Sequence, residues 1–362
     1  MANENHLRIL DAAANRAAEG LRVVEDYVRF VLDDGHLTRL TKQLRHDLAR
    51  ACSALPADQR HSVRDTQLDV GTQITTATEA AREDASEVCR ISCERVKQSL
   101  RSLEEYGKLL DAQFAKRIEA LRYTLYTVER SLGITEASRL RLRDTNLCVL
   151  IDGQDAPEAF TTLVQQFIDA RVGMIQLRDK RLGDAELVER GRIMSELASS
   201  TRTDNPSWNP SLQGRGTMVI INDRPDIAAL VDADGVHLGQ GDMRVKDART
   251  IVGPRKLIGV STHHIEQARK AVLDGANYLG AGPTFPSSTK SFDEFSGLNY
   301  LKQVAGEIRL PKFAIGGIDA TNVEQVLATG IKQIAVSGAV VQAERPGDAV
   351  RELLRLIGSP AG

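Results

Sequence analysis

The feature that most constrains the fold is a repeated pattern in the C-terminal part of the chain, where a short apolar run is followed by a segment with helical periodicity. The pattern occurs eight times, with apolar runs at 147–151, 174–177, 218–221, 235–238, 257–260, 278–281, 313–315 and 334–336. The runs lack strict alternation, as expected for parallel strands that are covered on both faces. Eight successive strand-then-helix units predict an α/β protein with a (β/α)8 TIM barrel.

The N-terminal part has a different pattern, with apolar residues spaced three and four apart almost throughout. This spacing predicts helices at 7–32, 37–55, 85–110 and 112–131, with an irregular polar stretch at 56–71 and with Gly133 as the stop of the last helix. A chain of 362 residues is also longer than one typical core requires. We therefore predict an all-helical domain at 1–135 and a barrel domain at 136–362.

Net charge, apolar runs and cysteine spacing limit the kinds of ligand and the cellular location that we expect for this chain. The formal net charge is −2, so no overall basic field is present to hold nucleic acid or an anionic membrane, and any anionic ligand must bind a local cluster. No apolar run approaches the roughly 20 residues that span a bilayer, and the start of the chain lacks the basic-then-apolar pattern of a signal segment. The cysteines follow no disulfide or zinc spacing, which predicts buried thiols in a reducing cytoplasm; they are Cys52, Cys89, Cys93 and Cys148.

Catalysis in such barrels takes place where the strands end and the loops begin. At the end of the predicted strand 174–177, the side chains of Gln176, Arg178 and Lys180 point to one side, and Leu177 points to the other. Two cations and an amide suit a di- or triphosphate, since arginine gives bidentate contacts and lysine a point charge. A solvated loop in which the arginine pairs with Asp179 is the alternative.

Two carboxylates end neighbouring strands. Asp223 follows Asn222, and Asp242 ends the segment that contains His237. Carboxylates at neighbouring strand ends can share one hard cation, leaving its other positions to water and phosphate. Each aspartate could instead cap a following helix, but their place beside a cationic strand end favours Mg2+. We interpret His237 as a hydrogen-bonded wall residue rather than a metal ligand.

Hydroxyl groups follow the fifth and sixth strands. Ser261 ends the fifth, where the alternative is a helix N-cap. The loop after the sixth strand combines rigid Gly-Pro segments with a hydroxyl cluster and Lys290, which can bind phosphate oxygens and close over a site. A serine-rich surface loop is the alternative reading of this segment.

Glycines follow the last two strands, as Gly316 and Gly317 after the seventh and as Gly338, next to Ser337, after the eighth. Glycines let backbone N–H groups approach an anion closely, and a following helix N-terminus adds its dipole. The loops after strands seven and eight are also the usual phosphate site of this fold. The sequence therefore predicts a phosphorylated ligand without indicating which one.

Taken in order, these segments resemble thiamine-phosphate synthases, over about residues 146–345. The matching motifs are QLRDK at 176–180, ND at 222–223, GVHLGQGD at 235–242, GVSTH at 259–263, GPTFPSSTK at 282–290, IGGI at 315–318 and VSGA at 336–339. Three positions depart from the family pattern, in that Asp179 stands where Glu is frequent, Ser287 where Thr is frequent, and Gly338 where Ser is common. The first two substitutions keep the chemistry, and the third matters little if a backbone N–H binds the ligand.

The resemblance implies a transferase that condenses 4-amino-2-methyl-5-(diphosphooxymethyl)pyrimidine with 4-methyl-5-(2-phosphoethyl)thiazole, or with the carboxylated form of this thiazole. The products are thiamine phosphate and diphosphate, formed by a Mg2+-assisted dissociative displacement. The alternatives are a barrel similar to the related thiazole tautomerase and a non-catalytic protein that binds a phosphorylated metabolite. Both alternatives use small phosphorylated partners as well.

The resemblance also implies roles for single residues. The pyrimidine diphosphate site consists of Gln176, Leu177, Arg178, Asp179, Lys180, Asn222, Ser261 and Lys290. The catalytic residues among these are Arg178, Lys180, Ser261 and Lys290. The thiazole phosphate site consists of Ser287, Ser288, Thr289, Gly317, Ser337 and Gly338. Asp223 and Asp242 hold one Mg2+ per active site.

The helical region carries charged residues near one helical face, and further candidates follow them. They are Asn15, Arg16, Glu19, Arg22 and Glu25, then Arg45, His46, Arg64, Asp65, Asp69 and Arg101. A surface laced with salt bridges is the structural interpretation. The region resembles helical domains that are sometimes fused to these synthases and are suspected of a pyrimidine phosphate kinase step, although no P-loop or kinase signature is present. Dimerisation or regulation is the other alternative, so a homo-oligomer stays open.

Overall fold

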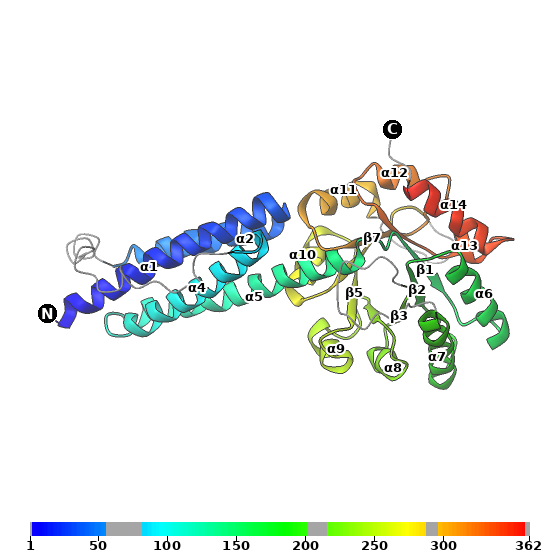
Figure 1. The fold of residues 1–362 in the computed structure, drawn as a ribbon, viewed down its shortest axis with the longest axis horizontal. Helices are drawn as coiled ribbons and strands as arrows, with labels where there is room; N and C mark the ends of the chain where they lie inside the picture. The colour runs from blue at the N-terminus through cyan, green and yellow to red at the C-terminus, as the bar shows by residue number, and fades with distance from the viewer. Residues whose placement is uncertain (1, 56–81, 201–215, 287–295, 359–362) are drawn as a thin grey trace. The chain divides into compact units, whose positions relative to one another are not determined.

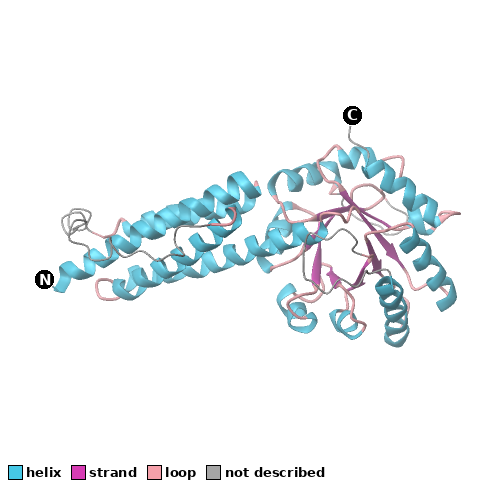
Figure 2. Cartoon of the chain, viewed as in Figure 1, coloured by secondary structure: helices cyan, strands magenta, loops and turns pink. Residues whose placement is uncertain are grey.

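The computed structural model describes residues 2–55, 82–200, 216–286 and 296–358. The chain divides into two compact units, Met1–Leu132 and Gly133–Gly362 (Figure 1). The described residues of the first unit form helices joined by short loops, and the strands of the described residues all lie in the second (Figure 2). None of the helices in the described ranges has the length and apolar character that crossing a membrane requires.

The helical unit is built as the apolar spacing predicts. Its elements are α1 (Ala2–Tyr27), the short π-helix η1 (Val28–Leu32), α2 (Gly35–Cys52), α4 (Ala85–Gly107) and α5 (Ala112–Leu142). The side chain of Asp34 accepts a hydrogen bond from Leu37 N at the start of α2, and Asp84 accepts one from Glu87 N at the start of α4, so each N-cap satisfies one free N–H group of its helix end. The core includes Leu10, Leu21, Leu44, Leu100, Leu103, Phe114 and Ile118. The predicted irregular stretch at 56–71 lies outside the described residues.

Charged residues of this unit pair with one another. Arg45 Nε lies 2.7 Å from a carboxylate oxygen of the buried Glu25, which also lies 4.0 Å from Arg22. Arg101 contacts Glu104 and Glu105, both at 2.8 Å. These pairs are what the salt-bridge interpretation expects, and they engage four of the predicted charged candidates between them. Arg64, Asp65 and Asp69 lie outside the described residues.

The end of helix α5 differs from the prediction. Gly133 does not stop the helix, which continues to Leu142. A glycine in a helix interior costs only about 1 kcal/mol relative to alanine. Burial of the following turns outweighs this cost, because Thr135, Ser138 and Leu142 are all buried.

The second unit is a closed barrel of parallel strands in the order β1 to β8, as predicted. The strands are β1 (Leu147–Ile151), β2 (Met174–Leu177), β3 (Met218–Asn222), β4 (Gly235–Leu238), β5 (Leu257–Thr262), β6 (Tyr278–Ala281), β7 (Lys312–Ile315) and β8 (Gln333–Val336). The helices are α6 (Pro157–Asp169), α7 (Asp184–Ser200), α8 (Pro225–Leu230), α9 (Val245–Val252), α10 (Ile265–Asp274), α11 (Gly297–Glu307), α12 (Val323–Leu327), α13 (Gly338–Val341) and α14 (Pro346–Gly358). They surround the strands (Figure 2).

The N-terminal end of the barrel is filled by the last turn of α5. Leu142 is fully buried in a core cluster with Cys148, Met174, Leu257 and other residues near the starts of the strands. Gln333 Nε2 donates to the carbonyl oxygens of Leu142 and Thr145, each at 2.9 Å. The strand ends that carry the predicted chemistry therefore surround the open end. The four cysteines are free and buried, as predicted.

The turns of α5 just before this plug also belong to the barrel fold. Ser138 Oγ accepts a hydrogen bond of 3.1 Å from Asn277 Nδ2, and Asn277 Oδ1 in turn accepts one from Ile258 N. We expect a fragment that begins at Gly133 to fold, and one that begins at Arg139 to be less stable. The shorter fragment lacks Ser138, so the half-buried Asn277 Nδ2 loses its acceptor, at about 1 kcal/mol.

Thermal unfolding followed by circular dichroism measures this difference. A cost of that size lowers Tm by roughly 2–4 °C per kcal/mol in a domain of this length. Ser138→Ala in the longer fragment serves as the matched control, because it removes the same hydrogen bond while keeping the helix. Equal Tm values for the two fragments would show that the turns before Arg139 do not stabilise the barrel.

Candidate active site

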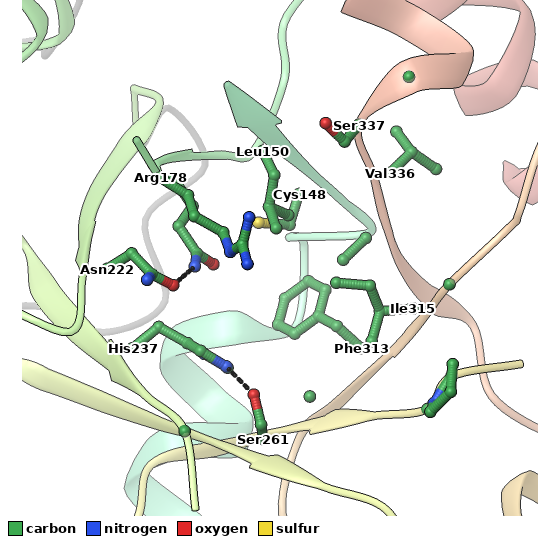
Figure 3. Close-up of a pocket in the computed structure, with 18 of the residues that line it drawn as sticks. Cys148, Leu150, Arg178, Asn222, His237, Ser261, Phe313, Ile315, Val336 and Ser337 are labelled. Carbon is green, nitrogen blue, oxygen red and sulfur yellow. Dashed lines mark hydrogen bonds between the residues drawn. The ribbon is translucent and has the colours of Figure 1, made fainter. Parts of the chain in front are cut away.

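The carboxyl ends of the strands surround a cavity of about 1140 Å3 (Figure 3). Its floor includes Cys148, Tyr278, Phe313 and Ala335, from β1, β6, β7 and β8. Its walls contain eleven of the predicted site residues: Gln176, Arg178, Asp179, Lys180, Asn222, Asp223, Asp242, Ser261, Gly317, Ser337 and Gly338. The barrel therefore brings together side chains that lie up to 162 positions apart in the sequence, from 176 to 338.

The remaining predicted residues are Leu177 and four residues of the loop after β6. Leu177 is 1% exposed and does not line the cavity, since its side chain lies on the other face of β2. Ser287, Ser288, Thr289 and Lys290 lie outside the described residues.

Two cations reach the cavity from the end of β2. The guanidinium of the half-buried Arg178 points into the cavity (Figure 3), and Lys180 is exposed at its rim. Within the described ranges, neither side chain has a hydrogen bond or an ion pair with another residue. The alternative of an Arg178–Asp179 pair is not formed. Unpaired cations on a cavity wall are suited to bind an anion.

Asp179 instead holds the loop that follows β2. Its carboxylate accepts hydrogen bonds from Gly153 N at 2.9 Å, Arg181 N at 2.6 Å and Leu182 N at 3.2 Å. Partial burial raises the pKa of this carboxyl, but these hydrogen bonds and that from the Arg181 side chain outweigh it and lower the pKa to about 2. The geometry thus gives Asp179 a role in fixing the loops after β1 and β2.

Asp223 and Asp242 converge beside these cations. Neither caps a helix, because the N-cap positions of α8 and α9 are Arg224 and Arg244. Burial and then the adjacent Asp242 carboxyl group together raise the pKa of Asp223 to about 6, against the opposing effect of Lys180 and Arg178. Two carboxylates held together in this way favour a proton or a cation between them.

The donor set fits a hard divalent cation that takes only part of its coordination from the protein. Among the described residues, no group of three or more His, Cys, Asp or Glu side chains is placed to hold a metal ion. Mg2+ is commonly bound through one or two carboxylates, with water and substrate phosphate oxygens completing an octahedron. The Asp223–Asp242 pair, next to unpaired cations that suit a phosphate, meets that description.

An amide pair stands between the cations and the aspartates. Gln176 Nε2 donates to Asn222 Oδ1 at 2.7 Å (Figure 3), and Gln176 is buried. With the amides oriented by this bond, the pair retains the Gln176 carbonyl oxygen and the Asn222 amino group for further hydrogen bonds. It therefore offers a ligand one acceptor and one donor, side by side.

His237 is a satisfied wall residue, as interpreted from the sequence. Its Nε2 lies 2.9 Å from Ser261 Oγ and its Nδ1 lies 3.2 Å from the Tyr278 hydroxyl. Burial lowers the pKa of His237 to about 4, so the ring is neutral at physiological pH. Ser261 does not cap a helix either, because α10 begins after His264.

The last two strands end in the predicted glycine-rich segments. Gly316 and Gly317 have φ values of 103° and 63°, which favour glycine. A Cβ on Gly317 would lie 2.4 Å from the carbonyl oxygen of Pro286, so this glycine allows the loop after β6 to pack against β7. Ser337 and Gly338 line the cavity where α13 begins. Backbone N–H groups are thus available on this side of the cavity, opposite in barrel order to β3 and β4, which Asp223 and Asp242 follow.

Some lining residues were not predicted from the sequence. Tyr278, Cys148 and Phe313 form the floor, and the only signal for them is the alternation along each strand. Tyr278, for example, lies two positions before the lining residue Gly280 and shares its face of β6.

Comparisons with known proteins agree with this geometry. The family described as Thiamine monophosphate synthase matches residues 147–340, and the ThiD2 family matches residues 8–131. A thiamine phosphate pyrophosphorylase structure from Pyrococcus furiosus superposes with a TM-score of 0.50 at 33% identity, covering 59% of this chain and 95% of that chain.

Relatives with both parts of the chain are also known. A thiamine-phosphate synthase from Rhodopirellula baltica is 44% identical over 344 residues, covering 92% of this chain and 88% of the relative. One from Synechocystis is 37% identical, covering 96% of this chain and 95% of the relative. The chain belongs to the thiamine-phosphate synthase family and is a transferase of thiamine biosynthesis.

Proposed function

We propose that the barrel condenses 4-amino-2-methyl-5-(diphosphooxymethyl)pyrimidine with 4-methyl-5-(2-phosphoethyl)thiazole, or its carboxylated form, to give thiamine phosphate and diphosphate. The observation that carries this proposal is the convergence of two unpaired cations, Arg178 and Lys180, with the Asp223–Asp242 pair in one cavity. A diphosphate leaving group needs cationic contacts, and a bridging Mg2+ needs carboxylates that are free to face it.

Arg178 and Lys180 stabilise the diphosphate leaving group in this proposal. Negative charge on the bridging oxygen of the diphosphate grows as its bond to the pyrimidine methylene carbon breaks, so contacts from Arg178 and Lys180 strengthen toward the transition state. Lys290, outside the described residues, is proposed to join them. Mg2+, when held by Asp223 and Asp242, supplies further charge stabilisation to the same group.

The amide pair orients the pyrimidine. An aminopyrimidine presents an amino donor next to a ring-nitrogen acceptor, which complements the acceptor and donor left on Gln176 and Asn222. Loss of the diphosphate then leaves a pyrimidine-methyl cation, which the thiazole nitrogen captures. Departure before capture needs no proton transfer, in keeping with a His237 ring that is neutral and engaged at both nitrogens.

The thiazole phosphate is proposed to bind on the other side of the cavity. The backbone at Gly317, Ser337 and Gly338 lies there, together with Ser287, Ser288 and Thr289 of the loop outside the described residues. The negative charge of this phosphate does not change during the reaction, so its site contributes binding and orientation rather than transition-state stabilisation.

Product formation tests the proposal directly. Incubation of the full chain with both substrates and Mg2+ should give equal amounts of thiamine phosphate and diphosphate, and chelation of the metal should stop the reaction. A thiazole tautomerase or a non-catalytic binding protein would release no diphosphate. The unpaired cations beside the Asp223–Asp242 pair favour the synthase over both. The four free cysteines suit the reducing cytoplasm that we propose as its location.

Gly338→Val is expected to raise the KM for the thiazole phosphate about tenfold or more while leaving kcat within about twofold, because it blocks an anion whose charge stays constant. Gly338 is a better position for this test than Gly317. A Cβ on Gly338 would meet only the flexible Gln342 side chain, at 3.5 Å, whereas one on Gly317 would displace backbone.

Steady-state kinetics with each substrate varied separately measures the effect. Gly306→Val is the matched control, since a Cβ there meets nothing within 4 Å and the residue does not line the cavity. If Gly338→Val chiefly raises the KM for the pyrimidine diphosphate, the two half-sites are assigned the wrong way round.

A further inference from the structure

Three side chains on neighbouring strands form a continuous hydrogen-bonded chain from the floor of the cavity to its wall. The Tyr278 hydroxyl on β6 lies 3.2 Å from Nδ1 of His237 on β4, and Nε2 of His237 lies 2.9 Å from Oγ of Ser261 on β5. Figure 3 shows the last of these contacts, with Ser261 at the cavity wall. The contact between Tyr278 and His237 spans β5, the strand that carries Ser261.

A glycine makes this crossing possible. Gly259 of β5 pairs in register with His237 on one side and with Tyr278 on the other. A Cβ on Gly259 would lie 2.1 Å from Cζ of Tyr278 and 2.5 Å from its hydroxyl oxygen, so any side chain there would displace the tyrosine ring. Glycine weakens a strand and often marks such a close approach. The rings are therefore held in contact by the strand geometry itself.

The Tyr278 hydroxyl determines which atom donates in each hydrogen bond of the chain. The Tyr278 side chain is buried, and within the described residues His237 Nδ1 is the acceptor that its hydroxyl reaches. A buried hydroxyl hydrogen without an acceptor is costly, so Tyr278 donates and Nδ1 accepts. A neutral imidazole then carries its hydrogen on Nε2 and donates it to Ser261 Oγ. The hydrogen of the Ser261 hydroxyl is left free to point into the cavity.

We propose that the chain Tyr278→His237→Ser261 has this fixed direction and makes Ser261 a hydrogen-bond donor to an acceptor atom of the bound pyrimidine diphosphate. Tyr278 and His237 act through Ser261 and are positioning residues. The identity of the ligand rests on the proposed function, whereas the direction of the chain rests on the geometry of the protein alone. With the opposite direction, Ser261 would donate to His237 and would offer the ligand only an acceptor.

The first test reads the histidine tautomer in the protein without substrate. Nitrogen-15 NMR of the ring distinguishes a protonated from an unprotonated nitrogen, and loss of the signals in His237→Gln assigns them. We expect the Nε2–H form in the unmodified protein and a mixture of tautomers in Tyr278→Phe, which keeps the ring and removes only the donor. The Nδ1–H form in the unmodified protein would overturn the proposal.

The second test asks whether Tyr278 acts through Ser261. Tyr278→Phe is expected to lower kcat/KM for the pyrimidine diphosphate about fivefold to tenfold, and Ser261→Ala by about tenfold or more, as for the loss of one hydrogen bond. The double variant should be no slower than Ser261→Ala alone, because the tyrosine has nothing left to orient. Multiplied effects in the double variant would show that Tyr278 does not work through the serine.

Tyr300→Phe is the matched control. The buried Tyr300 hydroxyl donates to Thr262 Oγ1 at 2.6 Å. Thr262 lies on β5 next to Ser261, but neither Tyr300 nor Thr262 lines the cavity. This variant loses a buried phenol hydroxyl as Tyr278→Phe does, and it should leave kcat/KM within about twofold. If both variants lose activity equally, a general loss of packing explains the effect and the positioning role is rejected.

The two tests separate this inference from the proposed function. The tautomer measurement needs no substrate. A protein that shows the Nε2–H form but makes no thiamine phosphate would refute the function and leave the chain intact, whereas an active protein with the Nδ1–H form would refute only the chain. Inhibition by inorganic diphosphate identifies the acceptor atom. Weaker inhibition of Ser261→Ala than of the unmodified protein places the acceptor on the diphosphate, whereas unchanged inhibition together with the loss in kcat/KM places it on the pyrimidine.

Discussion

Asp223→Asn and Asp242→Asn should each lower kcat by about 10²- to 10⁴-fold at a fixed Mg2+ concentration, and should raise the Mg2+ concentration needed for half-maximal rate. One Lewis-acid contact with the leaving group is worth several kcal/mol, and each 1.36 kcal/mol is about tenfold in rate. Asparagine keeps the shape of aspartate and tolerates the positive φ of 60° at position 223, so the substitution removes charge without straining the backbone.

The control for this prediction is Asp247→Asn, on α9. Asp247 forms an exposed ion pair with Arg244 at 2.8 Å and does not line the cavity, so Asp247→Asn should change neither kcat nor the response to Mg2+. Initial rates across a Mg2+ titration measure all three variants. An unchanged Mg2+ response in both Asp223→Asn and Asp242→Asn would exclude this pair as the metal site.

Arg178→Ala is expected to lower kcat by about 10²- to 10³-fold, with a change in KM for the pyrimidine diphosphate of less than about tenfold. Its guanidinium is placed in the cavity with no partner among the described residues, so it meets the ligand without first breaking a salt bridge. Because the leaving group gains charge as its bond breaks, this contact contributes more to the transition state than to substrate binding.

Arg178→Lys separates charge from geometry. It keeps one positive charge but loses the planar bidentate fork, and we expect it to recover only part of the rate. Arg244→Ala, the other member of the exposed pair, is the control and should behave as the unmodified protein. Single-turnover kinetics would place the defect in the chemical step. A large rise in KM at constant kcat would instead mean that Arg178 binds the diphosphate equally in both states.

The barrel was predictable from the sequence because parallel strands leave a strong signal. Each is an apolar run covered on both faces, and all eight predicted runs are strands, with β3, β5, β7 and β8 longer by one or two residues. The same reasoning located most of the cavity wall, since the carboxyl end of a parallel strand can only face the mouth of a barrel. Asp223 and Arg178 lie where such strand ends must bring them.

Features that depend on tertiary contacts could not be predicted in this way. The end of α5 is set by burial of Ser138 and Leu142, which outweighs the helix-breaking tendency of Gly133. Asp179 has the sequence position of a ligand-binding residue, but its carboxylate binds loop backbone, and one partner, Gly153 N, lies 26 positions away. Tyr278 carries no motif, and its significance depends on the glycine beside it on the next strand.

The burial of Leu142 at the base of the barrel limits how ligands enter and leave the cavity. With Leu142 buried there, the cavity is closed at its base among the described residues and opens at the opposite end of the barrel. When two ligands share one opening, the ligand that lies nearer the floor of the cavity must bind first and leave last. Lys180 and Asp242 are exposed at the open end of the cavity, whereas Tyr278 is buried at its floor. In the proposed reaction, a diphosphate bound near this opening can therefore leave while the pyrimidine ring beneath it stays in place.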